Sequence, residues 1–204
     1  MTCGQENSGG PGGRSLFLAI IRHGQTTANQ QGVIQGHGDS PLTGIGKASS
    51  LAKAAKLARF HFSAVYCSDL PRARATLEII QGSLPGAPEP VFTGELREID
   101  FGQYAGSRKS LIMDAVTRHK TDTSLKYPGG ESGDDLAARV GGFIVRLRRT
   151  TLEGYALVVT HYGVIETMAK RHGGFPAGEA FTLGEEAVVV LRLWEAGGGE
   201  LEIL

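Results

Sequence analysis

The stretch Leu16-Phe17-Leu18-Ala19-Ile20-Ile21, followed directly by Arg22-His23-Gly24, decides how this chain folds. This apolar run is too short for a helix, and the glycine-rich sequence on both sides is typical of a central strand buried on two faces. Such a strand delivers a cation and an imidazole together to the carboxyl edge of a sheet, where open α/β folds keep their ligand crevice. The sequence therefore predicts a site at Arg22 and His23.

Apolar runs and helix signals alternate along the rest of the chain. Further strands are expected at 63–67, 91–93, 156–159, 187–194 and 201–204, the last two as a hairpin. Helices are expected at 43–59, from about 68, at 110–119, from 132 and at 162–172, with Thr43, Ser68 or Asp69, and Ser132 as N-caps. This alternation predicts a three-layer α/β/α sandwich with a mostly parallel central sheet.

Composition favours one domain. The 204 residues are 41% hydrophobic and 21% charged, as in an ordinary globular protein. We expect residues 1–15, which are polar and glycine-rich, to be a flexible tail, and residues 16–204 to form the single domain. The weakly patterned segment at about 103–130 is expected to be a lid over the sheet edge.

Several classes of function are disfavoured by composition. Lys plus Arg equals Asp plus Glu at 21 each, so no net charge favours nucleic acid or a membrane surface. No apolar run approaches the about 18 residues of a transmembrane helix, and residues 1–15 lack the pattern of a secretory signal. Cys3 and Cys67 form no metal-spaced cluster, which favours a cytoplasmic protein. The expected partner is a small molecule, bound by a monomer or homodimer.

The candidate catalytic residues lie at the ends of predicted strands and at the start of one predicted helix. His161 follows the strand 156–159, Arg72 lies near the helix start at Pro71, and Glu98 follows the strand 91–93. With Arg22 and His23 they lack the spacing of a metal site. The chain also has no Gly-x-Ser-x-Gly elbow and no phosphate-binding P-loop.

This set of residues suits a phosphoryl group. Phosphoryl transfer spreads negative charge over oxygens, which two guanidinium groups and an imidazole stabilise. A neutral His23 is a competent nucleophile at phosphorus and gives a covalent intermediate. Glu98 is the carboxylic acid available to protonate the leaving oxygen and later to accept a proton from water.

Five blocks of sequence carry a resemblance to a known family. They are Arg22-His23-Gly24-Gln25-Thr26 with Asn29, Ser68-Asp69-Leu70-Pro71-Arg72-Ala73, Leu96-Arg97-Glu98 with Phe101-Gly102, Gly129-Gly130-Glu131-Ser132, and Val159-Thr160-His161. In this order, from about residue 16 to about 195, they resemble the histidine phosphatase superfamily, which has the phosphoglycerate mutase-like fold. The resemblance implies a phosphatase that needs neither metal nor cofactor.

The resemblance also implies roles for individual residues. His23 is the phosphorylated nucleophile and Glu98 the proton donor and acceptor. The phosphate pocket is expected to contain Arg22, Arg72, His161 and Asn29, and the lining of the site Gln35, Gly36 and the backbone after His161. Tyr162 departs from the family pattern, because many relatives have glycine after the second histidine, and it is expected to line the substrate site.

The superfamily contains both mutases and phosphatases. The mutase branch typically reads Glu-Arg-x-Tyr-Gly at the acid block, whereas this chain has Glu98-Ile99-Asp100-Phe101-Gly102. The short chain should let water reach the phosphohistidine, which favours hydrolysis. Among the phosphatases, the chain resembles α-ribazole phosphatase and broad-specificity bacterial members, so we expect a small phosphorylated metabolite such as α-ribazole 5′-phosphate as substrate.

Two alternatives stay open at this point. One is a cofactor-dependent phosphoglycerate mutase, in which Arg108, Lys109, Arg118 and His119 of the segment 103–130 bind a second anion. The other is a non-catalytic module that binds phosphorylated ligands. Because all of the matched chemical residues are present, the enzyme is the favoured interpretation.

Overall fold

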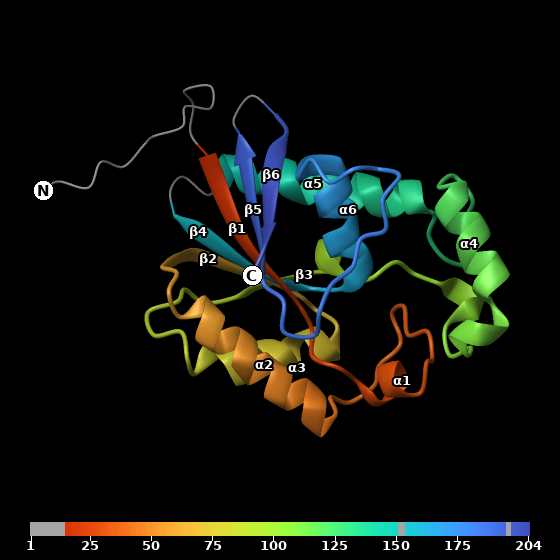
Figure 1. Ribbon diagram of the computed structural model, residues 1–204, viewed down its shortest axis with the longest axis horizontal. Helices are drawn as coiled ribbons and strands as arrows, with labels where there is room; N and C mark the ends of the chain where they lie inside the picture. The colour runs from red at the N-terminus through yellow and green to blue at the C-terminus, as the bar shows by residue number, and fades with distance from the viewer. Residues whose placement is uncertain (1–14, 151–153, 195–196) are drawn as a thin grey trace, which may run out of the picture.

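The computed structural model of this protein describes residues 15–150, 154–194 and 197–204 (Figure 1). Its centre is a six-stranded sheet with the order β3-β2-β4-β1-β5-β6. The strands are β1 (Ser15–Arg22), β2 (Phe62–Ser68), β3 (Val91–Thr93), β4 (Tyr155–Thr160), β5 (Val189–Trp194) and β6 (Gly199–Ile203). All six correspond to strands predicted from the sequence.

Most of this sheet is parallel. Strands β1 and β2 both pair with β4 in parallel, and β3 pairs with β2 in the same way. Strand β5 runs antiparallel to β1, and β6 antiparallel to β5, as expected for a hairpin. Strand β1 is central, and its last residue, Arg22, lies opposite Thr160 at the end of β4.

Helices cover both faces of the sheet (Figure 1). Helices α2 (Gly44–Leu57) and α3 (Pro71–Gln81) lie on one face, and α5 (Gly133–Thr150) and α6 (Tyr162–His172) lie on the other. Helix α4 (Met113–Thr121) lies to one side of these layers, and α1 (Thr27–Gln30) is a single turn after β1. The short 3-10 helices are η1 (Gly94–Leu96), η2 (Gly102–Tyr104) and η3 (Lys109–Leu111).

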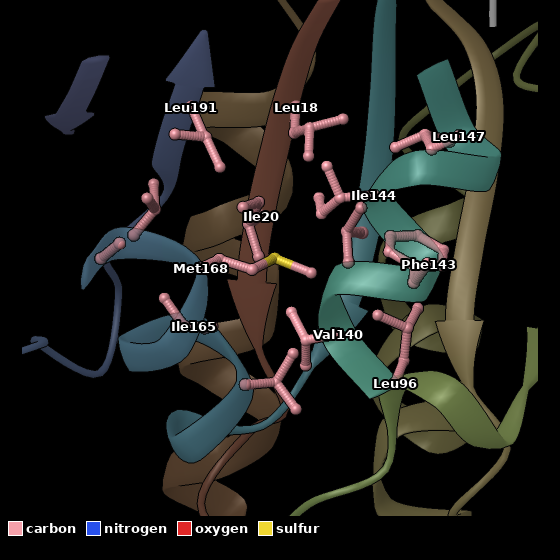
Figure 2. Packing of buried hydrophobic residues seen from close by; sticks show 14 of the residues in the cluster. Leu18, Ile20, Leu96, Val140, Phe143, Ile144, Leu147, Ile165, Met168 and Leu191 are labelled. Carbon is pink, nitrogen blue, oxygen red and sulfur yellow. The ribbon is translucent and has the colours of Figure 1, made fainter. Parts of the chain in front are cut away.

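The two-sided core explains the continuous apolar sequence of β1. Successive side chains of a strand point to opposite faces. Leu18 and Ile20 accordingly pack against α5 and α6, in the cluster that Figure 2 shows. Ala19 and Ile21 belong to the second cluster, with residues of α2 and α3. The predicted three-layer α/β/α sandwich with a mostly parallel sheet is therefore confirmed.

Some local predictions were wrong. Helix α3 begins at Pro71, and its N-cap is Leu70, which provides no side-chain cap. The predicted caps have other partners: the Ser68 hydroxyl accepts the Leu70 N–H at 3.3 Å, and Asp69 forms an ion pair with Arg97. Helix α1 was not predicted at all. The caps at Thr43 and Ser132 are confirmed, the latter by reciprocal hydrogen bonds with Asp135.

The proposed boundaries can be compared with the structure in part. Residues 1–14 of the expected tail lie outside the described residues, whereas Ser15 already belongs to β1. The segment 103–130 carries α4 and is joined by backbone hydrogen bonds to the loop after α1, from Ile34 N–H to Ser107 and from Lys109 N–H to Gly32. Its function as a lid stays a prediction. No helix in the described parts of the chain is both long and apolar enough to span a bilayer.

Candidate active site

The two histidines of the predicted site lie side by side. His23 follows β1 and His161 follows β4, and the His23 N–H continues the ladder by donating to the Thr160 carbonyl at 2.9 Å. Their ring centroids are 5.1 Å apart. Both side chains are buried, at 3% and 0% exposure. Parallel pairing of the two strands thus produces the juxtaposition that the sequence predicted.

His23 is held as a neutral imidazole with a defined orientation. Its Nδ1 lies 2.8 Å from the Gly24 carbonyl, to which it donates, and its Nε2 accepts from Arg72 Nε at 3.3 Å. Burial, and then the neighbouring Arg22 and Arg72, hold the pKa of His23 well below its usual 6.5. Nε2 is therefore unprotonated at neutral pH, as a nucleophile requires.

Arg72 brings a fixed positive charge to this lone pair. It lies in the first turn of α3, is 2% exposed, and donates to the carbonyls of Gly36 at 2.7 Å and Gly38 at 2.8 Å. Gly36 has φ 53°, a left-handed backbone conformation that favours glycine. Burial lowers the pKa of Arg72 to about 10, so the side chain stays charged at neutral pH.

Three of the predicted site residues have a buried polar atom without a partner among the described residues. The His161 ring pairs through Nε2 with the Ser68 hydroxyl at 2.8 Å, which leaves its Nδ1 without a partner among the described residues. Arg22 Nε and Gln35 Oε1 are likewise buried and unpartnered within that part of the chain. Since buried polar groups are normally hydrogen-bonded, Arg22 Nε indicates a ligand with an acceptor atom, such as a phosphoryl oxygen. His161 Nδ1 does the same in the tautomer in which Nε2 accepts from the Ser68 hydroxyl.

Glu98 lies on irregular backbone after η1 and meets the start of α6. Its Oε1 accepts the Ile99 N–H at 2.9 Å, and its Oε2 accepts the Gly163 N–H at 3.2 Å. A Cβ on Gly163 would come within 2.3 Å of Glu98 Oε1, so glycine is required for this approach. The negative charge of Glu98 offsets part of the lowering that burial imposes on the pKa of Arg72.

An arginine that the sequence analysis missed fixes the backbone that carries Glu98. Arg139 of α5 donates to the carbonyls of Glu95 at 3.0 Å, Arg97 at 2.8 Å and Glu98 at 3.3 Å. Glu131 pairs with the same guanidinium at 3.0 and 2.6 Å. No local pattern could have identified Arg139, because these carbonyls lie more than forty positions earlier in the chain.

A second ion pair holds the same segment from the other side. Arg97 donates to both carboxylate oxygens of Asp69, at 2.7 and 2.6 Å. His37 adds a contact between its Nε2 and the Glu98 carbonyl at 2.9 Å. The acid is therefore positioned by side chains from three separate parts of the chain.

Two of the predicted substrate residues have structural partners. The Asn29 side-chain oxygen accepts the Thr26 N–H at 3.1 Å and the Thr26 hydroxyl at 3.0 Å, which closes the cap of α1. Its contact with phosphate stays a prediction. The Tyr162 hydroxyl donates to the Phe181 carbonyl, and its ring lines a pocket beside Glu98.

The described residues contain no group of three or more His, Cys, Asp or Glu side chains arranged to hold a metal ion. The described site brings together a neutral imidazole at His23, the guanidinium of Arg72 and the carboxylate of Glu98. These are the parts that phosphoryl transfer needs, since it depends on positioning and electrostatic stabilisation.

Comparison with known proteins agrees with this arrangement. The family model of the histidine phosphatase superfamily (branch 1) matches residues 18–203. The chain belongs to this superfamily. The resemblance stated from the five sequence blocks is thereby confirmed.

Relatives in the superfamily have two kinds of activity. The chain is 32% identical to the adenosylcobalamin/alpha-ribazole phosphatase of Escherichia coli, over 79% of this chain and 81% of that protein. It is also 32% identical to the 2,3-bisphosphoglycerate-dependent phosphoglycerate mutase of Rhizobium etli, over 72% and 74%. The solved alpha-ribazole phosphatase from Shigella flexneri superposes with a TM-score of 0.78 at 28% identity, covering 93% of this chain and 96% of that one.

Proposed function

We propose that this chain hydrolyses phosphomonoesters of small metabolites through a phosphohistidine formed on His23, with Glu98 as proton donor and acceptor. The observation that carries the proposal is the buried, neutral His23, whose ring lies 5.1 Å from that of His161, together with two buried nitrogens that have no partner among the described residues, Arg22 Nε and His161 Nδ1. A nucleophilic imidazole in the field of neighbouring guanidinium groups suits a phosphoryl group, whose oxygens carry negative charge.

In the first step His23 Nε2 attacks phosphorus and the bond from phosphorus to the ester oxygen breaks. Protonated Glu98 gives its proton to that oxygen, so the alcohol leaves as a neutral molecule. The hydrogen bond from His23 Nδ1 to the Gly24 carbonyl fixes the orientation of the imidazole ring during the attack. Arg22 and Arg72 balance the charge that develops on the phosphoryl oxygens.

In the second step the Glu98 carboxylate accepts a proton from water. The water oxygen attacks phosphorus, the bond from nitrogen to phosphorus breaks, and inorganic phosphate leaves. His23 returns to its neutral form with a free Nε2, and Glu98 is again protonated, which completes the cycle.

Hydrolysis is favoured over mutase chemistry by the acid block, where Ile99 and Phe101 stand in place of the arginine and tyrosine of the mutase pattern. A mutase must hold a second anionic group of its substrate. In the pocket beside Glu98 the ammonium groups of Lys120 and Lys170 are both paired with Glu166, at 3.4 and 2.9 Å. A second anion would have to compete with that carboxylate.

The test compares His23→Ala with His61→Ala, a matched change at an exposed histidine. We expect His23→Ala to lower phosphate release from ethyl phosphate by about a thousandfold or more, as loss of a covalent nucleophile does. His61→Ala should stay within about twofold of the wild type. Quenching in alkaline detergent during turnover preserves the acid-labile bond between nitrogen and phosphorus, and it should trap phosphate on the wild type and on His61→Ala but not on His23→Ala. Equal phosphate release by the two variants would remove His23 from the mechanism.

A further inference from the structure

Lys53 is a buried lysine of α2 that the proposed mechanism does not use. It is 1% exposed, although lysine is almost never fully buried unless it is paired. Its Nζ donates to the carbonyl of Arg22 at 2.8 Å. The ammonium group is therefore bonded to the peptide that joins Arg22 to His23, the proposed nucleophile.

The strand register explains why this carbonyl needs a donor. The N–H of the same peptide, that of His23, points toward β4 and donates to the Thr160 carbonyl. The carbonyl of a peptide points the opposite way from its N–H, here toward the β5 side of β1. The pairing of β1 with β5 ends at Ile20, two residues before Arg22. Lys53 therefore supplies the partner that the ladder no longer provides.

The charge of Lys53 is compensated by a neighbouring loop. Taking an ammonium group out of water is costly unless opposite charge offsets the loss. Glu185 and Glu186, in the loop before β5, provide that charge, and Lys56 ties the loop to α2 through the Glu186 carbonyl at 2.9 Å. Burial lowers the pKa of Lys53 to about 8, against the opposing effect of the two glutamates and with a further lowering by Arg22. Lys53 is therefore charged at neutral pH and loses its charge just above it.

The positive charge of Lys53 acts on the phosphate site. The Glu185 carboxylate lies 3.8 Å from the Arg22 guanidinium, and these two opposite charges offset each other. Lys53 supplies the positive charge that remains in this group of three side chains. After burial and the two arginines, it also contributes to holding the pKa of His23 below 6.5. A buried charge acts over a longer distance than an exposed one, because the protein interior screens it less than water does.

We propose that Lys53 is a positioning residue of the phosphate site, which fixes the peptide between Arg22 and His23 and supplies a buried positive charge for phosphoryl transfer. The inference rests on the proposed function, because Lys53 acts through the residue that attacks phosphorus. It adds a third cation, from α2, to the guanidinium groups of Arg22 and Arg72. Activity should therefore depend on the protonation of a side chain that does not contact the substrate.

The experiment measures kcat/KM for p-nitrophenyl phosphate between about pH 7 and 9.5. This ester is fully ionised over that range, its leaving group needs no proton from Glu98, and kcat/KM reports only the steps up to the phosphohistidine. The pKa of His23 lies below this range and that of Arg72, about 10, above it. We expect the wild type to lose about three- to tenfold as the pH rises through about 8, because neutral Lys53 keeps its hydrogen bond but not its charge.

Lys53→Met removes the charge while keeping a side chain of similar length. At pH 7 we expect its kcat/KM to lie about three- to tenfold below that of the wild type, with no decrease through about pH 8, so that the ratio narrows toward high pH. Lys47→Met, at an exposed position of the same helix, is the matched control and should keep the wild-type rate and profile. A loss by the same factor at every pH would indicate a merely structural role and overturn the proposal.

Glu185→Gln decides the question if Lys53→Met does not fold. Because Glu185 raises the pKa of Lys53 against the effect of burial, its loss should move the decrease in activity to lower pH by about half a unit or more. A wild-type profile that is flat from pH 7 to 9.5, or a decrease that Glu185→Gln leaves in place, would rule out this role of Lys53 and leave hydrolysis standing. Failure of the wild type to release nitrophenol at any pH would instead refute the proposed function.

Discussion

His23 and Glu98, the proposed nucleophile and the proposed acid, are held by different kinds of structure. His23 and His161 extend two paired strands, so the backbone ladder and the two-sided core determine where they lie. Glu98 lies on irregular backbone, and ion pairs made by Arg139 and Arg97 hold that backbone in place. A single side-chain change should therefore disturb the acid more easily than the nucleophile.

Glu98→Gln should separate the contribution of Glu98 from that of the two histidines most clearly. We expect kcat/KM for ethyl phosphate to fall by about 10² to 10⁴, the range of general acid catalysis, because the alkoxide would leave without a proton. For p-nitrophenyl phosphate the loss should be much smaller, since nitrophenolate leaves readily unprotonated. Equal losses for both esters, measured by phosphate release, would contradict the acid role.

Gly163→Ala tests the contact between Glu98 and α6. The added Cβ would lie 2.3 Å from Glu98 Oε1, so the carboxylate must move, and a shift of about 1 Å can cost about a hundredfold in rate. We expect a loss of about ten- to a hundredfold with ethyl phosphate. Gly141→Ala in α5 is the control, because nothing lies within 4 Å of its Cβ position. Similar kinetics for the two variants would show that Glu98 does not depend on this contact.

Arg139→Met tests the support of the acid loop. Removing the guanidinium leaves three carbonyls without their donor. We expect kcat/KM for ethyl phosphate to fall about tenfold, with little change for p-nitrophenyl phosphate, because the acid is displaced while the nucleophile is not. Arg146→Met, which removes an ion pair to Glu95 from the same helix, is the matched control. A loss that is the same for both esters would indicate a general structural effect.

The smallest expected effect is on stability, and it tests the burial of His23 and His161. Burial holds the pKa values of His23 and His161 well below 6.5 in the folded protein, while the unfolded chain takes up protons near 6.5. Stability should therefore fall as pH decreases below 6.5, by about 1 kcal/mol per histidine between pH 7 and 5.5. Urea unfolding at these two pH values measures the difference. His23→Ala should show a smaller decrease, and an unchanged pH dependence would argue against a buried neutral ring.

The sequence predicted that His23 and His161 follow neighbouring strands, and it did so for a physical reason. An apolar run followed by a polar residue predicts a buried strand and the position of its end, and parallel strands bring their carboxyl ends together. His23 and His161 followed from that rule. Pro71 in the first turn similarly placed Arg72 near a helix start, although the cap itself was predicted wrongly.

The surroundings of Glu98 could be predicted only in part. Glu98 was identified by its residue type and by family resemblance, but its support by Arg139 depends on contacts between α5 and distant backbone. Such contacts leave no periodic pattern in the sequence. The contacts of Asn29 are local, in contrast to those of Glu98. The Asn29 side-chain oxygen accepts from Thr26, three residues earlier, and this bond forms part of a helix cap. Local capping can account for a residue that a family resemblance assigns to the ligand.

The register of β1 against β4 has a consequence for how new specificities can be engineered. The 5.1 Å between the two imidazole rings is close to the spacing of about 4.8 Å between neighbouring strands. The reactive pair thus inherits its separation from the sheet and owes nothing to segment 103–130. That segment can be exchanged for another sequence, or recombined between homologues, while the phosphoryl chemistry is retained, so a library confined to it should yield altered substrate choice in still active clones.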